Sequence, residues 1–190
     1  MPGRLVLASA SPRRLTLLAQ VGVKPDYVCP AEVNEIPAPN ELPRHTAARL
    51  AREKARVVAE HYPNDIVLAA DTVVACGRLL LDKPDSETVA EAHLRRLSGQ
   101  SHRVYGAVSV VTADGRMLKR LVVTRVIFKR LHDREIATYL ASGEWQGKAG
   151  AYAIQGLADG FVKKINGSYS NVVGLPLYET LCLLNSAGLE

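Results

Sequence analysis

The sequence has few cysteines and no long apolar run. Its three cysteines, Cys29, Cys76 and Cys182, lie far apart and form no C-x-x-C pair. We therefore interpret them as buried thiols of a protein in a reducing compartment. No segment approaches the roughly 18 apolar residues that a membrane-spanning helix needs, and the apolar stretch near the N-terminus is too short for a signal peptide. These absences predict a cytoplasmic protein without membrane contact.

Aromatic residues are also scarce, and no charge sign dominates strongly. Aromatics make up 5% of the chain and do not interleave with the basic residues, so the stacking platforms of a single-strand binder are missing. The five histidines show no metal-ligand spacing. The net charge of +5 favours a polyanionic ligand, although charge alone does not separate a nucleotide from DNA. The missing stacking platforms lead us not to expect nucleic acid as a partner.

Apolar patterns of strand and helix period alternate along the 190 residues. This alternation, with one hairpin, predicts an α/β fold with a mixed sheet, and the absence of a linker predicts a single domain over residues 1–190. The predicted strands are Arg4–Ala8, Tyr27–Cys29, Ile66–Cys76, Leu79–Leu81, Arg103–Val111, Met117–Phe128 and Phe161–Ile165. The predicted helices are one from Pro12 to Gly22 capped by Ser11, Pro43–His61, Ser86–Leu97, one capped by Asp133 that ends near Gly143, and one from Pro176.

The first candidate site is the turn Ser9-Ala10-Ser11-Pro12-Arg13-Arg14. A strand that runs into a helix N-terminus presents free amide donors and the positive end of the helix dipole. The hydroxyl of Ser9 and the guanidinium groups of Arg13 and Arg14 add donors suited to phosphate oxygens. The alternative is a capped helix with two solvated arginines.

The second candidate is Asp71, the one charge inside the apolar run Leu68–Ala75. A carboxylate in a buried strand needs an ion pair, a metal or a place at a cleft wall, because burial without a partner is costly. A structural ion pair would explain it, and so would a metal or a catalytic water.

Four further residues are weaker candidates. Lys54 falls on the apolar stripe of the helix Pro43–His61, where it either snorkels to the rim or points into a cleft. A hairpin return could bring Lys83 near Asp71, although Lys83 also fits an ordinary loop. Glu35 is a loop acid, and Gln155 either reads a base edge or lies on the surface of a glycine-rich turn.

Taken together, six segments resemble the Maf family of nucleotide pyrophosphatases, in the family's order and over nearly the whole chain. They are Leu7–Arg14, Arg52–Ala55, Ala70–Val74, Asp82–Pro84, Gly147–Gly156, and Ile165–Tyr169 with Gly174–Leu177. The resemblance implies an elongated fold related to inosine-triphosphate pyrophosphatases, with helices on both sides of the sheet and a central cleft between two lobes. It also implies a homodimer and a link to cell division.

The resemblance further implies an activity and a set of site residues. The activity is cleavage of a nucleoside triphosphate between its α- and β-phosphates with a divalent metal, Mg²⁺ or Mn²⁺. Asp71 matches the family's acid-base residue, while Glu35, Lys54 and Lys83 match its other charged residues. The metal ligands would be Asp71 and Glu35.

Substrate choice in the family follows the positions of Arg13, Thr72 and Gln155, and this set resembles the subgroup that cleaves dTTP and UTP. An amide suits the mixed donor and acceptor edge of uracil or thymine, whereas the 7-methyl-GTP subgroup carries an acid in place of the glutamine.

Two alternative functions stay open. One is a pyrophosphatase for damaged purines, and the other is a non-catalytic regulator that binds nucleotide or nucleic acid through the basic helix around Arg49–Arg56.

Strand alternation raises a geometric problem for this assignment. Neighbouring residues of a strand point to opposite faces of the sheet. Asp71 and Thr72 therefore cannot both face one cleft unless the strand ends or bulges between them.

Overall fold

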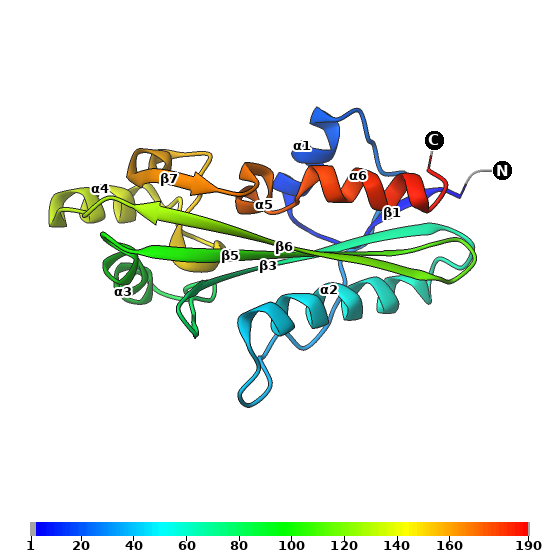
Figure 1. The fold of residues 1–190 in the computed structure, drawn as a ribbon, viewed down its shortest axis with the longest axis horizontal. Coiled ribbons are helices and arrows are strands. Elements are labelled where there is room, and N and C mark those ends of the chain that lie inside the picture. Colours follow the sequence, from blue (N-terminus) through cyan, green and yellow to red (C-terminus); the bar gives the residue numbers. More distant parts are fainter. Residues whose placement is uncertain (1–2, 190) are drawn as a thin grey trace.

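A computed structural model describes residues 3–189 and shows an elongated molecule built along the length of one sheet (Figure 1). In these residues no helix is long and apolar enough to cross a membrane. The prediction of three buried thiols is wrong, because Cys182 is exposed and the other two cysteines are only partly buried.

The elements follow the predicted order, with three additions, which are the two 3₁₀ turns and α5. Their bounds are β1 Leu5–Leu7, α1 Pro12–Gln20, β2 Tyr27–Val28, α2 Pro43–Ala59, β3 Ile66–Cys76, β4 Leu79–Leu80, α3 Glu87–Leu97, β5 Ser101–Val111, β6 Met117–Phe128, α4 Asp133–Ser142, the 3₁₀ turns η1 Ala149–Ala151 and η2 Leu157–Phe161, β7 Val162–Asn166, α5 Tyr169–Val173 and α6 Leu177–Ser186.

The seven strands form one sheet in the order β2-β1-β3-β5-β6-β7, with β4 paired to the end of β3. The pairs among β2, β1 and β3 are parallel, and those from β3 through β5 and β6 to β7 are antiparallel. β3 lies at the centre because its continuous apolar run suits burial on both faces. The predicted mixed α/β fold is confirmed.

Helices cover both faces of this sheet. On one face α2 packs its small residues against β3 and β5, in clusters that include Ala47, Ala51 and Ala55. On the other face α1 and α6 join a larger cluster, to which α3 and α4 contribute at the far end of the sheet (Figure 1). The predicted helices on both sides are therefore present.

Three local details differ from the sequence-based expectations. Ser11 is the N-cap residue of α1, but its side chain makes no capping hydrogen bond. His132, rather than Asp133, is the N-cap residue of α4. No helix is expected over Tyr169–Val173, where α5 forms with the Ser168 side chain accepting a hydrogen bond from the amide of Asn171.

In the described part of the chain, one edge of β3 lacks a neighbouring strand at mid-length. On that side β1 pairs only with residues 66–68, and β4 pairs only with Ala75 and Cys76. We call the stretch between them, residues 69–74, the open edge of β3. Side chains on both faces of the strand can be approached from this edge.

Candidate active site

A pocket of about 530 Å³ lies along the open edge of β3. Its walls come from the β1–α1 turn, the loop before α2, α2 itself, the segment before η1 and the end of α5. Cations outnumber acids in this wall: the lining includes Arg13, Arg14, Lys54, Lys83 and Lys148, against Glu35 and Asp71. A pocket with this charge suits a polyanion.

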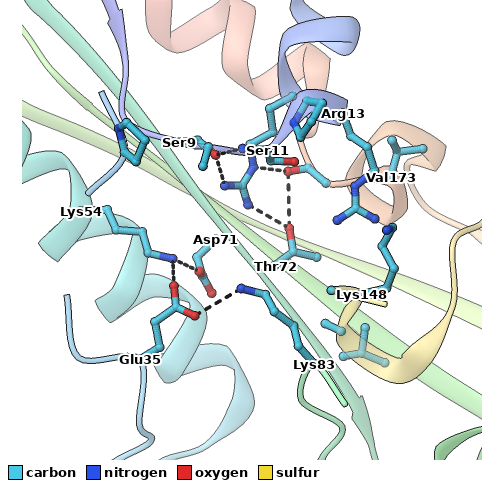
Figure 2. Close-up of a pocket in the computed structure, with 18 of the residues that line it drawn as sticks. Ser9, Ser11, Arg13, Glu35, Lys54, Asp71, Thr72, Lys83, Lys148 and Val173 are labelled. Atoms are coloured by element: carbon cyan, nitrogen blue, oxygen red, sulfur yellow. Dashed lines mark hydrogen bonds and ion pairs between the residues drawn. The ribbon is translucent and has the colours of Figure 1, made fainter. Parts of the chain in front are cut away.

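Lys54 joins the two acids on the α2 side of the pocket. Its Nζ donates to Oδ1 of Asp71 at 2.7 Å and lies 2.6 Å from Oε1 of Glu35 (Figure 2). The side chains of Lys54 and Asp71 are only 9% and 10% exposed, so each charge needs the other. The small neighbours of Lys54 on α2 let this helix lie close to the sheet, which points the ammonium at the strand.

Lys83 approaches the same cluster from the segment after β4. Its Nζ donates to Oε2 of Glu35 at 3.3 Å. Burial raises the pKa of Glu35, but the hydrogen bonds and charges of Lys54 and Lys83 outweigh it and lower the pKa overall. The structure thus brings together all four charged residues that the resemblance implies for catalysis.

The loop that carries Glu35 is attached to α2 by Arg49. The guanidinium donates to both carboxylate oxygens of Glu41, at 2.8 and 2.9 Å, and to Glu53 at 3.1 Å. It also donates to the carbonyl oxygens of Ile36 at 3.2 Å and Asn34 at 3.5 Å. One side chain therefore holds the main chain on both sides of Glu35.

The Arg49–Glu41 pair predicts a dependence of stability on pH. Hydrogen bonds from Arg49 lower the pKa of Glu41 to about 2, against about 4.3 in an unfolded chain. Because the folded pKa is the lower one, the pair stabilises the fold above about pH 4.3, and this contribution is lost as the pH falls toward 2. In urea titrations we expect the free-energy difference between the wild type and Glu41→Gln to be largest near neutral pH and to shrink toward about pH 3. A difference that stays constant over this range would contradict the assignment.

Arg14 lies on the opposite side of β3, where it has hydrogen bonds but, among the residues that the structure describes, no carboxylate partner. Its guanidinium donates to Oγ of Ser9 at 2.8 Å, to the carbonyl oxygen of Gly174 at 3.0 Å and to Oγ1 of Thr72 at 3.4 Å. Burial, together with the charge of Arg13, lowers the pKa of Arg14 although nearby acids oppose the shift. A partly buried guanidinium surrounded by neutral acceptors favours an anionic ligand.

Lys148 is a pocket residue to which the sequence patterns assigned no role. Figure 2 shows the ends of Arg13 and Lys148 facing one another across the pocket. Burial and the charge of Arg13 lower the pKa of Lys148, and burial also lowers the pKa of Arg13. A lysine beside two glycines in Gly147-Lys148-Ala149-Gly150 was the available signal, but only the fold shows that it opposes Arg13.

The alternation argument about Asp71 and Thr72 is wrong in its conclusion. β3 neither ends nor bulges there: Asp71 pairs with Ala107 and Thr72 with Gly106 in unbroken register. The two side chains do point to opposite faces, Asp71 to Lys54 and Thr72 to Gly174. Both nevertheless line one pocket, because the pocket extends around the open edge of β3.

Gln155 is the one predicted site residue that does not line this pocket. It is exposed, between η1 and η2. The structure therefore does not bring it together with Arg13 and Thr72, and its role in reading a base stays a prediction.

Two carboxylates in one wall suit a divalent metal. Mg²⁺ is commonly bound through one or two carboxylates, with substrate phosphates and water completing its coordination. Within residues 3–189 no cluster of three or more His, Cys, Asp or Glu side chains could hold a metal alone. Asp71 Oδ2 has no hydrogen-bond partner within those residues, since Lys54 contacts Oδ1. The donor set therefore fits a metal that the substrate helps to bind.

Comparison with known proteins identifies the family. The dTTP/UTP pyrophosphatase of Caulobacter vibrioides is 59% identical over 184 residues, which cover 97% of this chain and 95% of that protein. The dTTP/UTP pyrophosphatase of Rhodospirillum rubrum is 56% identical over 186 residues, covering 98% and 89%.

One solved structure is a more distant match. The nucleoside-triphosphatase, or dITP/XTP pyrophosphatase, of Mycobacterium abscessus is 16% identical with a TM-score of 0.42, covering 67% of this chain and 73% of that one.

Residues 4–187 match the family described as Maf-like protein. The match spans every element of the fold and all the residues of the pocket wall, and the chain belongs to the Maf family.

Proposed function

We propose that this chain hydrolyses dTTP and UTP to the nucleoside monophosphate and pyrophosphate. The predicted activity is the one that the names of its close relatives carry. The observation that carries the proposal is the excess of cations around a buried Lys54 that joins two carboxylates. A pocket with this composition is suited to bind a triphosphate and still keep a carboxylate next to the reacting phosphorus.

In the proposed reaction a water oxygen attacks the α-phosphorus, and the bond from that phosphorus to the α–β bridging oxygen breaks. Asp71 takes the proton of the attacking water, while Lys54 contacts Oδ1 and fixes the carboxylate. The bridging oxygen leaves with the β- and γ-phosphates as pyrophosphate. Cations in the wall offset the charge that develops on this leaving group.

We assign the remaining wall residues by their side of β3. Lys83 and Glu35 act beside Asp71, and Arg13, Arg14 and Lys148 receive phosphate oxygens on the other side with Ser9. Thr72, which accepts from Arg14, contacts the substrate at the open edge. Gln155, which is exposed between η1 and η2, is the residue that we assign to the base of the nucleotide.

Glu35 and Asp71 are the residues that would hold Mg²⁺ or Mn²⁺. When bound, such an ion polarises phosphate oxygens and lowers the pKa of water. Lys54 contacts both acids, so it also keeps two like charges together before the metal and substrate arrive. A single domain over the whole chain and a homodimer stay parts of the proposal.

A nucleotide panel tests the activity. The purified protein is incubated with Mg²⁺ or Mn²⁺ and dTTP, UTP, dCTP, dITP, XTP or 7-methyl-GTP, and phosphate is measured with and without added inorganic pyrophosphatase. We expect dTTP and UTP to be the nucleotides that give phosphate. They should give it only when pyrophosphatase is added, because the product of the reaction is pyrophosphate. Direct release of phosphate, or a preference for dITP and XTP, would overturn the proposal.

The non-catalytic rival has lost its main support. The basic helix around Arg49–Arg56 is not a free charged surface, because Arg49 is bonded to Glu41 and Glu53 and Lys54 points into the site. Binding of double-stranded DNA that weakens steeply with salt, without any turnover, would restore this rival.

A further inference from the structure

Glu35 lies in a loop that has no regular secondary structure. Residues 29–38 form neither helix nor strand between β2 and α2, and Ile36 beside Glu35 is 74% exposed. The side chain of Glu35 is 48% exposed, and its ion pairs within residues 3–189 are those with Lys54 and Lys83. Packing alone therefore does little to fix this acid, and something else must hold its main chain.

Arg49 supplies the missing constraint. Four of its five hydrogen bonds reach the loop: two go to the carboxylate of Glu41 at the end of the loop, and two go to the carbonyl oxygens of Asn34 and Ile36. Arg49 and Glu41 are 21% and 11% exposed, so the pair is partly shielded from water. A planar guanidinium forms such a pair with less loss of side-chain freedom than a lysine ammonium.

The geometry of α2 connects the hydrogen bonds of Arg49 to the site. Arg49 and Lys54 lie five positions apart on α2, so the same helix fixes the main chain of Glu35 with one residue and its carboxylate with the other. Glu53 accepts from Arg49 at 3.1 Å and orients the guanidinium. The side chain of Arg49 is not part of the pocket wall.

We propose that Arg49 is a positioning residue of the reaction, which acts by holding the Glu35 loop against α2. The proposal rests on the proposed function for its kinetic consequences, while the state of the loop can be measured without turnover. Arg49 touches no substrate in this scheme and acts only through Glu35.

A double-mutant cycle with Glu35→Gln tests the proposal. We expect Arg49→Gln to lower kcat for dTTP about tenfold in the wild type, the size of a lost positioning contact. In the Glu35→Gln background the same change should lower kcat less than about twofold, because interacting residues give non-additive effects. Arg49→Lys, which keeps the charge but not the planar guanidinium, should retain part of the kcat that Arg49→Gln loses. Arg56→Gln, exposed on the same helix, is the matched control and should leave kcat unchanged.

Hydrogen exchange of the peptide over residues 30–42 supplies the readout that is independent of turnover. Arg49→Gln should raise exchange there about tenfold and leave the strands of the sheet unchanged, whereas Arg56→Gln should not. Equal losses of kcat in both backgrounds, or unchanged exchange in the loop, would overturn the proposal. Should Arg49→Gln fail to fold, Arg49→Lys and Glu41→Gln carry the same comparison. A wild type that releases no pyrophosphate would reject the proposed function, and the exchange result would still decide whether Arg49 holds the loop.

Discussion

Asp71→Asn is expected to lower kcat for dTTP by about 10²–10⁴-fold, the usual contribution of a positioned acid-base group. The amide has nearly the shape of the carboxylate but cannot take the proton of the attacking water. It also removes the negative charge that faces Lys54 at 2.7 Å, which leaves a buried ammonium with Glu35 as its remaining partner. The measurement is pyrophosphate release under saturating dTTP and metal, with circular dichroism to confirm the fold.

The matched control is Asp114→Asn. Asp114 belongs to the turn between β5 and β6, where it pairs with Arg116 far along the chain from the pocket wall. We expect this variant to keep the kcat of the wild type. A folded Asp71→Asn variant with kcat within tenfold of the wild type would remove Asp71 from the catalytic role.

Gly106→Ala is expected to destabilise the fold by about 2–4 kcal/mol, although Gly106 is not part of the pocket wall. A Cβ at this position would overlap Oδ1 of Asn171 and lie 2.9 Å from its Cγ. Asn171 cannot move away, because it is fully buried and its Nδ2 donates to Val104 O at 3.2 Å and Thr124 Oγ1 at 3.0 Å. Unfolding in denaturant measures this decrease in the free energy of unfolding directly.

Two comparisons isolate this clash. Gly160→Ala is the control, because a Cβ there meets nothing within 4 Å, and we expect almost no change in the free energy of unfolding. In an Asn171→Ala background the added methyl group has room, so Gly106→Ala should cost much less than in the wild type. Additive losses would show that the clash is not the cause.

Much of the catalytic side of the site could be predicted from single residues in their local pattern. Asp71 interrupts an apolar strand and Lys54 interrupts the apolar stripe of a helix, and burial makes each charge seek a partner. The fold joins these two interruptions in one ion pair. The positions of the strands were predictable for the same reason, since apolar period and turn residues are local properties.

The parts of the site and fold that could not be predicted depend on contacts between segments that are distant in the sequence. Whether Asp71 and Thr72 share a pocket depends on where β1 stops beside β3, which no pattern within β3 reveals. The opposition of Arg13 and Lys148 joins residues more than a hundred positions apart. α5 was missed because it has five residues, and its buried residues, Asn171 and Val173, are too few to form an apolar stripe.

The open edge of β3 divides the pocket into two surfaces that can evolve separately. Under the proposed assignment, the chemistry lies on the face of Asp71 and recognition of the substrate begins on the face of Thr72, with one peptide bond between them. A substitution at Thr72 can change what is bound without moving Asp71, because the strand keeps its register with β5. A one-residue insertion in β3 would exchange the two faces and abolish both functions together. Replacement of residues is therefore an accessible route to new specificity in this fold, whereas a change of length in β3 is not.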